Sequence, residues 1–477
     1  MDGMIEMPSL QEAGLENGRL ETVYQRLVQN GLRICTDSRK LQTGDCFVAL
    51  RGERFDGHGF VGKALEGGAA LVLAEEVPAS VDTALQDRVL LVRDSLAALQ
   101  CLARHHRRTV SGLQVIGVAG SNGKTTCKEL IYAVLSKHYV CHATPGNFNN
   151  HLGVALSLLG IREGTRLAVI EIGTNHPGEV EMLCHLAEPD LGVVTSIGKE
   201  HLEGLGSLEA ILHEETALYR WLNQTGGQAF ANLDNDLIMK GLKELRRPIT
   251  YGVLPESDCV GKLDKTFPYL QFRWDFNAKS VIDAPLLKSK IYGDYNFPHV
   301  LAAAAIGRYL SVPYEKISEA LTEWEPRNNR SQWLEHRGHG VVLDAYNANP
   351  DSMQAALGHF GRMEHPHKAV LLGEMLELGS HAEYEHRFLL ENLLRYPWEV
   401  CCLVGASFWS LRAEFPGFHF FERPEDLHGY LETSRWPASA VLVKGSRGNA
   451  MEQYLDSLPW AAEGPDQAGE SSVPSVG

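Results

Sequence analysis

The stretch VIGVAGSNGKTTCKEL, residues 115–130, joins an apolar β-branched run to a loop of small residues and then to a helical pattern. Val115–Val118 is typical of a buried strand. The apolar residues after the loop recur at helical spacing: Leu130, Ile131, Val134 and Leu135. Backbone N–H groups of such a loop and the N-terminus of the helix bind phosphate, and Lys124 and the Thr125 hydroxyl complete the site. The sequence therefore predicts a nucleotide-phosphate loop between a strand and a helix.

The loop differs from the general phosphate-loop pattern at one position. That pattern has glycine five residues before Gly123, where this chain has Val118, so the loop is a shortened variant. The alternative is a glycine-containing turn with a solvated lysine. The loop alone identifies no reaction.

Length and charge limit the class of protein. A chain of 477 residues suggests about three domains. The 44 basic and 60 acidic residues give a formal charge of -16, which disfavours nucleic acid or an anionic membrane as the main partner. Anionic substrates then need local basic pockets.

Cysteine usage and the N-terminus indicate the compartment. The nine cysteines form no CxxC pair, and the 20 histidines show no HExxH or zinc-finger spacing, which favours reduced thiols in a cytosol. The N-terminal MDGMIEMPSL is acidic where a signal peptide is basic, and no apolar stretch reaches the ~18 residues of a membrane span. We expect a cytoplasmic protein without a membrane span.

Strand and helix patterns alternate along most of the chain. Short strands and Gly-Asp or Asp-Gly turns at residues 34–60 predict a small α/β module. Further apolar strands lie in RLAVIEIGTN and DLGVVTSIGKEHLEG, and each ends in polar residues. Ligands collect at the carboxyl ends of strands in open α/β sheets, so Lys124, Glu171 and His201 are expected to converge on one crevice.

A second series of apolar strands begins near Gly340 and predicts another parallel sheet. The polar, irregular segment EWEPRNNRSQW, residues 323–333, precedes it and indicates a domain boundary. We therefore predict an α/β protein with domains at residues 1–111, 112–327 and 328–461 and a disordered tail at 462–477.

Several polar residues near strand ends are candidates for chemistry. Glu171 and the Thr125 hydroxyl can hold a magnesium ion that bridges the β- and γ-phosphates of a nucleotide, although an isolated strand-end glutamate is often only solvated. His201 is weak evidence alone, because a lone histidine more often makes a structural hydrogen bond.

Amide and basic side chains supply further candidates. TPGNFNNHLG, residues 144–153, offers uncharged donors and acceptors to a sugar or peptide, or simply forms a turn. Asn347 and Asn349 in DAYNANPDSM either contact a ligand or build a strand-to-helix turn. Lys444 and Arg447 in KGSRGN can bind a carboxylate, unless they are only solvated.

Taken together, these stretches resemble the Mur ligase family, the ATP-dependent amide ligases of peptidoglycan synthesis, over about residues 20–460. GSNGKTT resembles the ATP loop of the family, which has the same departure at Val118. Other stretches resemble the subgroup that adds D-alanyl-D-alanine: EIGTNHPGEV, HLEGLGS, DAYNANPDSM, GEMLELG and VLVKGSRG. The resemblance implies a UDP-binding N-terminal domain, a central P-loop ATPase-like domain with a mainly parallel sheet, and a Rossmann-like C-terminal domain.

The resemblance also implies ligands for individual residues. Those implied to bind ATP are Gly120, Ser121, Asn122, Gly123, Lys124, Thr125, Thr126, Asn296, Arg330 and Asp344, the last two when the C-terminal domain closes. Those implied or suggested to bind substrate are Ser38, Arg39, Thr144, Asn147, Asn149, Asn150, Asn347, Asn349, Lys444 and Arg447. Ser38 and Arg39, with FVALRGERFDGHGF, would hold the uridine nucleotide, and TPGNFNN the muramyl group. His299 stands where many members have a second asparagine that contacts adenine.

The implied reaction joins D-alanyl-D-alanine to UDP-N-acetylmuramoyl-tripeptide through an acyl phosphate, with ATP and Mg²⁺ and with Lys124 stabilising the transferred phosphoryl group. The alternatives are another amide ligase of the same plan and a nucleotide-gated binding protein without turnover. We expect a monomer. The third residue of the tripeptide, diaminopimelate or lysine, stays open.

One position departs from the family where it matters for mechanism. Mur ligases commonly have a lysine fourteen residues after the histidine that matches His201, and carbon dioxide converts that lysine to a carbamate that holds a second magnesium ion. Glu215 stands there in this chain, with Glu214 beside it. The hypothesis is that Glu215 replaces the carbamate, so that the metal ligands are Thr125, Glu171, His201 and Glu215. The alternative is a solvated acidic helix face.

Overall fold

The structure is a computed structural model that describes residues 7–52, 55–79, 81–242, 247–278, 280–365 and 367–460. The predicted disordered tail, the first six residues and two residues of the FVALRGERFDGHGF segment lie outside this range. The chain forms two compact units, Met1–Glu325 and Pro326–Gly477, which are described separately. Their boundary lies two residues before the predicted one at 327/328.

The N-terminal part of the first unit contains a parallel four-stranded sheet, as the short apolar strands predict. Its strand order is β1 (Ile34–Cys35), β2 (Cys46–Val48), β5 (Leu71–Ala74) and β6 (Val89–Leu91). A small antiparallel pair consists of β3 (Arg51–Gly52) and β4 (Phe55–Asp56). The helices are α1 (Leu10–Ala13), α2 (Arg19–Gln29), α3 (Val61–Glu66) and α4 (Ser95–Thr109).

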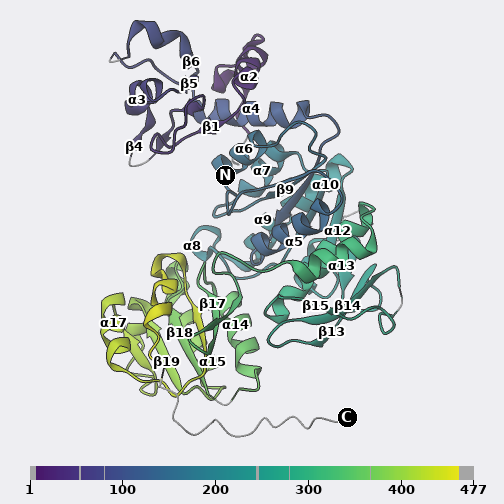
Figure 1. Ribbon diagram of the computed structural model, residues 1–477, viewed down its shortest axis with the longest axis vertical. Helices are drawn as coiled ribbons and strands as arrows, with labels where there is room; N and C mark the ends of the chain where they lie inside the picture. Colours follow the sequence, from purple (N-terminus) through teal and green to yellow (C-terminus); the bar gives the residue numbers. More distant parts are fainter. Residues whose placement is uncertain are drawn as a thin grey trace, which may run out of the picture. The chain divides into compact units, whose positions relative to one another are not determined.

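Helix α4 joins this part to the central part of the same unit, because it packs on α6 (His151–Leu159) and α7 (Glu179–Ala187). Arg104 and Arg108 of α4 both pair with Glu188, and Arg107 pairs with Asp190 at 2.8 Å. The predicted boundary at 111/112 therefore separates two sheets but crosses a packed interface (Figure 1).

The central part contains a nine-stranded sheet in the order β15-β14-β13-β12-β11-β10-β7-β9-β8. Seven strands are parallel: β13 (Cys259–Lys265), β12 (Ile249–Gly252), β11 (Gln228–Asn232), β10 (Leu191–Val194), β7 (Gln114–Ala119), β9 (Leu167–Glu171) and β8 (Cys141–Ala143). β14 (Gln271–Phe276) pairs antiparallel with β13 on one side and with the edge strand β15 (Leu287–Lys288) on the other.

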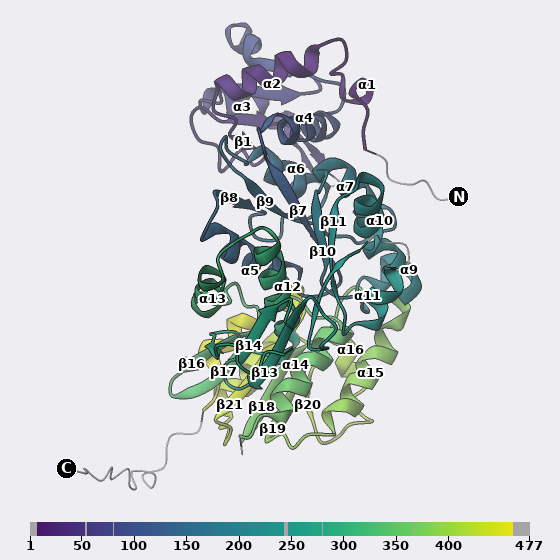
Figure 2. The same ribbon diagram turned by 90° about the vertical axis from the view of Figure 1, so that its right-hand side faces the viewer.

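Helices cover both faces of this sheet (Figure 2). One face carries α5 (Lys124–Ser136), α12 (Phe297–Tyr309) and α13 (Tyr314–Glu323), which pack together around an extensive apolar core. The other carries α7, α9 (Leu208–Glu215), α10 (Ala217–Thr225) and α11 (Asp236–Gly241). The predicted strand, loop and helix at residues 115–130 are confirmed as β7, the loop and α5, whose four predicted core residues are all buried.

The second unit has a six-stranded sheet, parallel except for its first strand. The order is β16 (Gln332–His336), β17 (His339–Asp344), β21 (Ala440–Lys444), β18 (Lys368–Gly373), β19 (Val400–Val404) and β20 (His419–Phe421). Its helices are α14 (Pro350–Arg362), α15 (Ala382–Leu393), α16 (Ala406–Ser410) and α17 (Pro424–Thr433). The predicted α/β class with mainly parallel sheets is confirmed.

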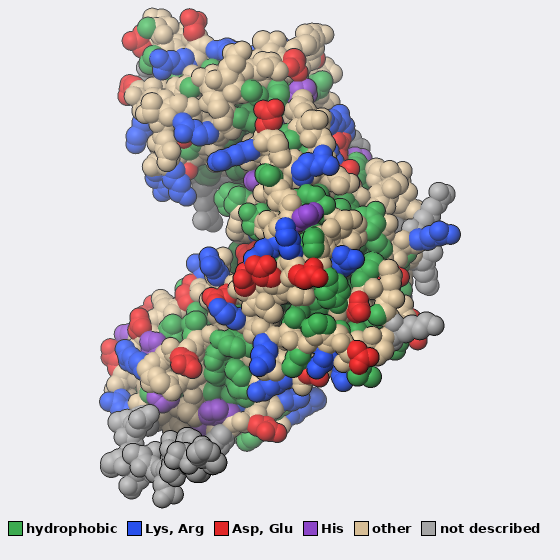
Figure 3. All heavy atoms as spheres, turned by 45° about the vertical axis from the view of Figure 1, so that its right-hand side comes forward, with side chains coloured by type: hydrophobic (Ala, Val, Ile, Leu, Met, Phe, Trp, Pro, Cys, Tyr) green, Lys and Arg blue, Asp and Glu red, His purple; other side chains and the backbone are tan. Residues whose placement is uncertain are grey.

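Among the helices of the described ranges, none has the length and apolar character that crossing a bilayer requires. On the face drawn in Figure 3, Lys and Arg side chains lie interspersed with Asp and Glu side chains.

Candidate active site

The loop between β7 and α5 has a backbone that requires glycine at two positions. Gly120 has φ +118° and Gly123 has φ +80°, both in the region that side chains rarely adopt. A Cβ atom at Gly120 would lie 2.4 Å from Thr195 Oγ1, and one at Gly123 would lie 2.0 Å from His299 Nε2. The two glycines therefore allow the loop to lie directly against its neighbours.

The segment after β10 holds this loop in place. Thr195 Oγ1 donates to the Asn122 carbonyl at 2.7 Å, and Ser196 Oγ accepts from the Asn122 N–H at 2.9 Å. Gly198 N donates to Ser121 Oγ at 2.9 Å. The side chain of Ser121 and the backbone of Asn122, both implied to meet ATP, thus also fix the shape of the loop.

Lys124 is the first residue of α5 and lies over the loop. Its ammonium donates to the carbonyl of Gly120 at 2.5 Å and lies 3.5 Å from Glu200 Oε2. Burial alone would lower the pKa of Lys124, but the carboxylates of Glu200, Glu215 and Glu171 together raise it above its ordinary value. The lysine is therefore a fixed positive charge at neutral pH.

Glu171 lies at the end of β9 with only 1% of its surface exposed, so it is not a solvated strand-end residue. Its Oε1 accepts from Thr125 Oγ1 at 3.1 Å and from Asn149 Nδ2 at 3.0 Å. Its Oε2 accepts no hydrogen bond from the residues that the structure describes and lies 3.5 Å from the ammonium of Lys128. The structure thus brings Thr125 and Glu171 together as predicted.

Glu214 and Glu215 lie side by side at the end of α9 but point to different partners. Glu215 is fully buried, and its Oε2 accepts from the N–H of Gly120 at 2.6 Å. Glu214 accepts from the N–H groups of Gly178 and Val180, each at 2.7 Å, at the N-terminus of α7. Glu215 is therefore the glutamate that reaches the phosphate loop, and neither residue belongs to a solvated helix face.

His201 precedes the short helix α8 (Leu202–Leu205) with φ +44°. Its Nε2 lies 3.8 Å from Glu200 Oε2. Burial raises the pKa of Glu200 well above its usual range, with nearby Glu215 adding to the rise and Lys124 opposing it. Sequence reasoning missed Glu200, although its place next to His201 at a strand end could have indicated it.

The side chains in the described ranges include no group of three or more His, Cys, Asp or Glu arranged to hold a metal ion. The predicted ligands Thr125, Glu171, His201 and Glu215 thus do not form a metal site made of protein groups alone. A magnesium ion on a nucleotide commonly takes one or two carboxylates and completes its shell with phosphate and water.

The residues of the Thr144–Gly153 loop divide into three kinds. Asn150 caps α6 by accepting from the N–H of Gly153 at 2.8 Å, so the turn-forming alternative holds for this residue. Thr144 Oγ1 accepts from the N–H of Glu171, and Asn149 donates to the same glutamate. Asn147 is exposed at the loop tip.

The residues implied to lie near adenine are both buried. Asn296 donates through Nδ2 to the carbonyl of Tyr292 at 2.8 Å. The ring of His299 packs against Gly123, its Nδ1 has no hydrogen-bond partner in the described part of the chain, and burial lowers its pKa to about 4. His299 is thus a neutral residue that supports the phosphate loop.

The residues implied to bind uridine lie at the edge of the N-terminal sheet. Arg39 is exposed and pairs with Asp37 at 2.9 Å, and Ser38 stands between them. In the FDGHGF segment, Asp56 Oδ1 pairs with His58 Nδ1 at 2.7 Å, and the buried ring accepts from a backbone N–H through Nε2.

In the second unit, the ammonium of the buried Lys444 pairs with the partly buried carboxylate of Asp344 at 2.6 Å. Lys444 also donates to the carbonyl of Asn347, and Asn347 itself is exposed. The guanidinium of Arg330 lies 3.5 Å from the ring centroid of Tyr346, a residue that sequence reasoning did not single out.

Two other predicted residues of the second unit have structural partners. Asn349 caps α14 by accepting from Ser352 N at 2.9 Å, as expected of a residue that builds the strand-to-helix turn. Arg447 is exposed and pairs with Glu452.

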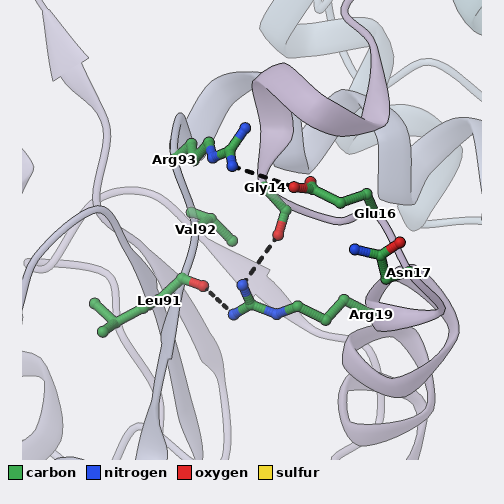
Figure 4. A pocket seen from close by; sticks show the side chains of 7 residues that line it. All are labelled: Gly14, Glu16, Asn17, Arg19, Leu91, Val92 and Arg93. Carbon is green, nitrogen blue, oxygen red and sulfur yellow. Dashed lines mark hydrogen bonds and ion pairs between the residues drawn. The ribbon is translucent and has the colours of Figure 1, made fainter.

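A pocket of about 250 Å³ in the N-terminal part contains none of these residues (Figure 4). It is lined by Gly14, Glu16, Asn17, Arg19, Leu91, Val92 and Arg93. Arg93 pairs there with Glu16 at 3.2 Å, and Arg19 donates to the carbonyls of Gly14 and Leu91. Its basic groups are thus engaged within the protein.

Comparison with known proteins agrees with this arrangement. Three family models match along the chain: "Mur ligase family, catalytic domain" at residues 33–107, "Mur ligase middle domain" at 118–307 and "Mur ligase, glutamate ligase domain" at 329–447. A UDP-N-acetylmuramoyl-tripeptide--D-alanyl-D-alanine ligase of Bacillus subtilis is 36% identical over 446 residues, which cover 91% of this chain and 94% of the relative. The chain belongs to the Mur ligase family.

Other relatives resemble this Mur ligase over a similar share of the chain. The ligase of the same name from Escherichia coli is 29% identical and covers 89% of this chain and 93% of its own. The crystal structure of MurF from Acinetobacter baumannii has a TM-score of 0.80 at 27% identity, covering 91% of this chain and 98% of that one. MurF ligase from Thermotoga maritima in complex with ADP has a TM-score of 0.77 at 27% identity, covering 90% and 97%.

Proposed function

We propose that this Mur ligase joins D-alanyl-D-alanine to UDP-N-acetylmuramoyl-tripeptide, with ATP cleaved to ADP and phosphate. The observation that carries the proposal is the phosphate loop with Lys124 and Thr125 beside the buried Glu171, in a chain 36% identical to a ligase of that name over 91% of its length. The intact loop and buried carboxylates disfavour a binding protein without turnover.

The residues of the loop act on the nucleotide by position and charge. The free N–H groups at the start of α5 would donate to the phosphates, and the Lys124 ammonium would neutralise charge that develops on the transferred phosphoryl group. The acid substrate takes up the phosphoryl group at its terminal carboxylate, and the amine of D-alanyl-D-alanine then displaces phosphate. No protein nucleophile is needed in such a transfer.

The donor set near the loop fits magnesium. Glu171 Oε2, Glu200 Oε1 and Glu215 Oε1 are buried oxygen atoms that accept no hydrogen bond from the described residues, and hard oxygen ligands are those that Mg²⁺ prefers. We infer that Thr125 and Glu171 hold one ion, and that His201 and Glu215 contribute to a second. When bound, magnesium neutralises charge on the phosphate oxygens.

Glu215 is our candidate for the group that replaces the carbamylated lysine of other Mur ligases. It is buried, carries a carboxylate and reaches the phosphate loop through Gly120, whereas Glu214 caps a different helix. A glutamate is permanently carboxylated, so activity is expected to survive exhaustive removal of carbon dioxide and bicarbonate. Loss of activity that bicarbonate restores would contradict this assignment.

The second unit carries Arg330 and Asp344, which the family resemblance implies as ligands of ATP. Arg330 is presented on the ring of Tyr346, and Asp344 is held by Lys444, so both are fixed at the carboxyl end of the sheet of their own unit.

The experiment that tests the function is phosphate release from ATP and Mg²⁺. Release should rise strongly only when UDP-N-acetylmuramoyl-tripeptide and D-alanyl-D-alanine are both present, and free D-alanine should not replace the dipeptide. Equal release with ATP alone would indicate a plain ATPase, and release with another amino acid would indicate a different ligase. Parallel assays with the diaminopimelate and lysine tripeptides identify the third residue.

The remaining proposals concern the setting of the enzyme. We infer a cytoplasmic monomer whose partners are these small molecules and not nucleic acid, which accords with the formal charge of -16 and the mixed charges in Figure 3. Sedimentation tests the monomeric state, and cell fractionation tests the cytoplasmic location.

A further inference from the structure

Lys128 is a buried cation that the phosphate-loop chemistry does not use. It lies one turn after Lys124 on α5, is 2% exposed, and is among the largest fully buried side chains of the described residues. Its ammonium donates to the carbonyl of Thr144 at 2.9 Å and to that of Gly146 at 2.6 Å. It also lies 3.5 Å from Glu171 Oε2.

A buried ammonium is costly unless charge and hydrogen bonds compensate it, so its partners indicate its role. A second buried lysine in this chain provides the comparison. Lys368 is 4% exposed and donates to the carbonyls of Phe360, Gly361 and Met363 at the end of α14. No ion pair of Lys368 with a carboxylate is present in the described part of the chain, so it is a helix cap, whereas Lys128 adds an ion pair with Glu171.

The contacts of Lys128 connect two ligand-binding regions. On one side are the carbonyls of the Thr144–Asn149 loop, whose tip exposes Asn147 and Phe148. On the other is Glu171, whose Oε1 accepts from Thr125 of the phosphate loop helix and from Asn149. Lys128 and Asn149 therefore hold the two oxygens of the same carboxylate, and both belong to the connection between the loop and α5.

We propose that Lys128 is a positioning residue that ties the Thr144–Asn149 loop to Glu171, so that binding of the acid substrate and binding of the magnesium nucleotide strengthen one another. This inference rests on the proposed function, in which the loop meets the muramyl group and Glu171 meets the metal. An ordered loop fixes Glu171, and a fixed Glu171 orders the loop. The ligand that binds first therefore bears the entropic cost of this ordering, and the second ligand binds more tightly.

The test measures this coupling by equilibrium binding rather than by turnover. UDP-N-acetylmuramoyl-tripeptide is titrated calorimetrically into the full-length wild type and Lys128→Met, with and without a non-hydrolysable ATP analogue and Mg²⁺. In the wild type the analogue should tighten tripeptide binding about fivefold or more, and in Lys128→Met this factor should fall to about one. Methionine keeps the apolar stem and volume but removes the charge and the donors.

Two further variants make the result specific. Lys368→Met removes an equally buried ammonium that caps α14, so it should lower the melting temperature while keeping the wild-type coupling factor. Asn149→Ala removes the other contact to Glu171 from a half-buried side chain, so it should also reduce the coupling. This variant decides the question if Lys128→Met does not fold.

The outcomes separate the two proposals. Wild-type protein that neither binds the tripeptide nor ligates it would overturn the proposed function and the inference with it. Normal ligation with no coupling in the wild type, or coupling that persists in Lys128→Met or, if that variant is unfolded, in Asn149→Ala, would overturn the role of Lys128 alone.

Discussion

Replacing Glu215 by glutamine should lower activity while leaving stability nearly unchanged. The amide oxygen of glutamine can still accept from the N–H of Gly120, as Glu215 Oε2 does at 2.6 Å. Its NH₂ group can face Glu200, whose pKa is raised by burial and by the neighbouring carboxylate of Glu215. Glutamine removes the repulsion from Glu200 but also the attraction to the Lys124 ammonium, so these two changes oppose one another and we expect the free energy of unfolding to stay within about 1 kcal/mol of the wild-type value at neutral pH.

Activity should fall, because the amide lacks the negative oxygen proposed to hold magnesium. We expect ligation to fall at least about 100-fold, the scale of losing one preorganised charged group in a site. The concentration of Mg²⁺ required for half-maximal rate should rise as well.

Glu214 provides the matched control, since it is adjacent to Glu215 and also buried but accepts its hydrogen bonds from different residues. It accepts from the N–H groups of Gly178 and Val180 and from Thr174 Oγ1 at the start of α7. The Glu214→Gln substitution leaves one acceptor oxygen for these donors and removes the negative charge at the N-terminus of α7. It should therefore lower the free energy of unfolding by about 1–2 kcal/mol. Ligation per folded molecule should stay at the wild-type level.

Urea unfolding and ligation assays across a Mg²⁺ series measure both variants. A Glu215→Gln enzyme with wild-type activity and unchanged Mg²⁺ dependence would refute the metal role. Equal destabilisation of the two variants would refute the reasoning on charge, because Glu215 would then be an ordinary cap of the loop.

Four further substitutions test the loop and its support. Lys124→Ala should reduce ligation by at least about 1000-fold with an unaltered circular dichroism spectrum, and normal ligation would exclude the phosphate-loop assignment. Gly123→Ala should lose about 1–2 kcal/mol of stability from its left-handed backbone, plus the cost of displacing His299. Gly226→Ala, at φ +76° with no atom within 4 Å of the added Cβ, should show the backbone cost alone in melting experiments. Burial lowers the pKa of His299 from 6.5 to about 4, so below about pH 6.5 the unfolded state takes up a proton that the folded state does not. Urea unfolding should therefore show about 2 kcal/mol less stability at about pH 5 than at about pH 7.5 from this residue, and His299→Asn should shrink that difference; an unchanged difference would contradict the buried neutral imidazole.

The fold and the phosphate loop could be predicted because local patterns determine them. The β-branched run at Val115–Val118 and the helical spacing after Lys124 each need only neighbouring residues to be recognised, and both elements are present. The association of Thr125 with Glu171 followed from strand-end geometry in a parallel sheet.

The roles of other polar residues depend on contacts across the chain, which spacing does not reveal. Lys444 was read as a ligand for a carboxylate, and the carboxylate it pairs with in the structure is Asp344, 100 positions earlier. Asn150 and Asn349 cap helices, a use that the turn alternative had allowed. Lys128 gave no signal except its spacing of four from Lys124, because its partners lie in a loop that follows the helix.

The charges around the phosphate loop explain why nucleotide and metal should bind as one unit. Glu171, Glu200 and Glu215 all act on Lys124, so three buried carboxyl groups surround the ammonium that would meet the phosphates. A bare triphosphate would gain from Lys124 and the loop N–H groups but be repelled by those carboxylates. A divalent cation between phosphate and carboxylate reverses the sign of that interaction. The carboxylates that repel a bare triphosphate therefore make the site selective for the magnesium complex of the nucleotide. In our proposal, Lys128 holds Glu171 in the orientation that this selectivity requires.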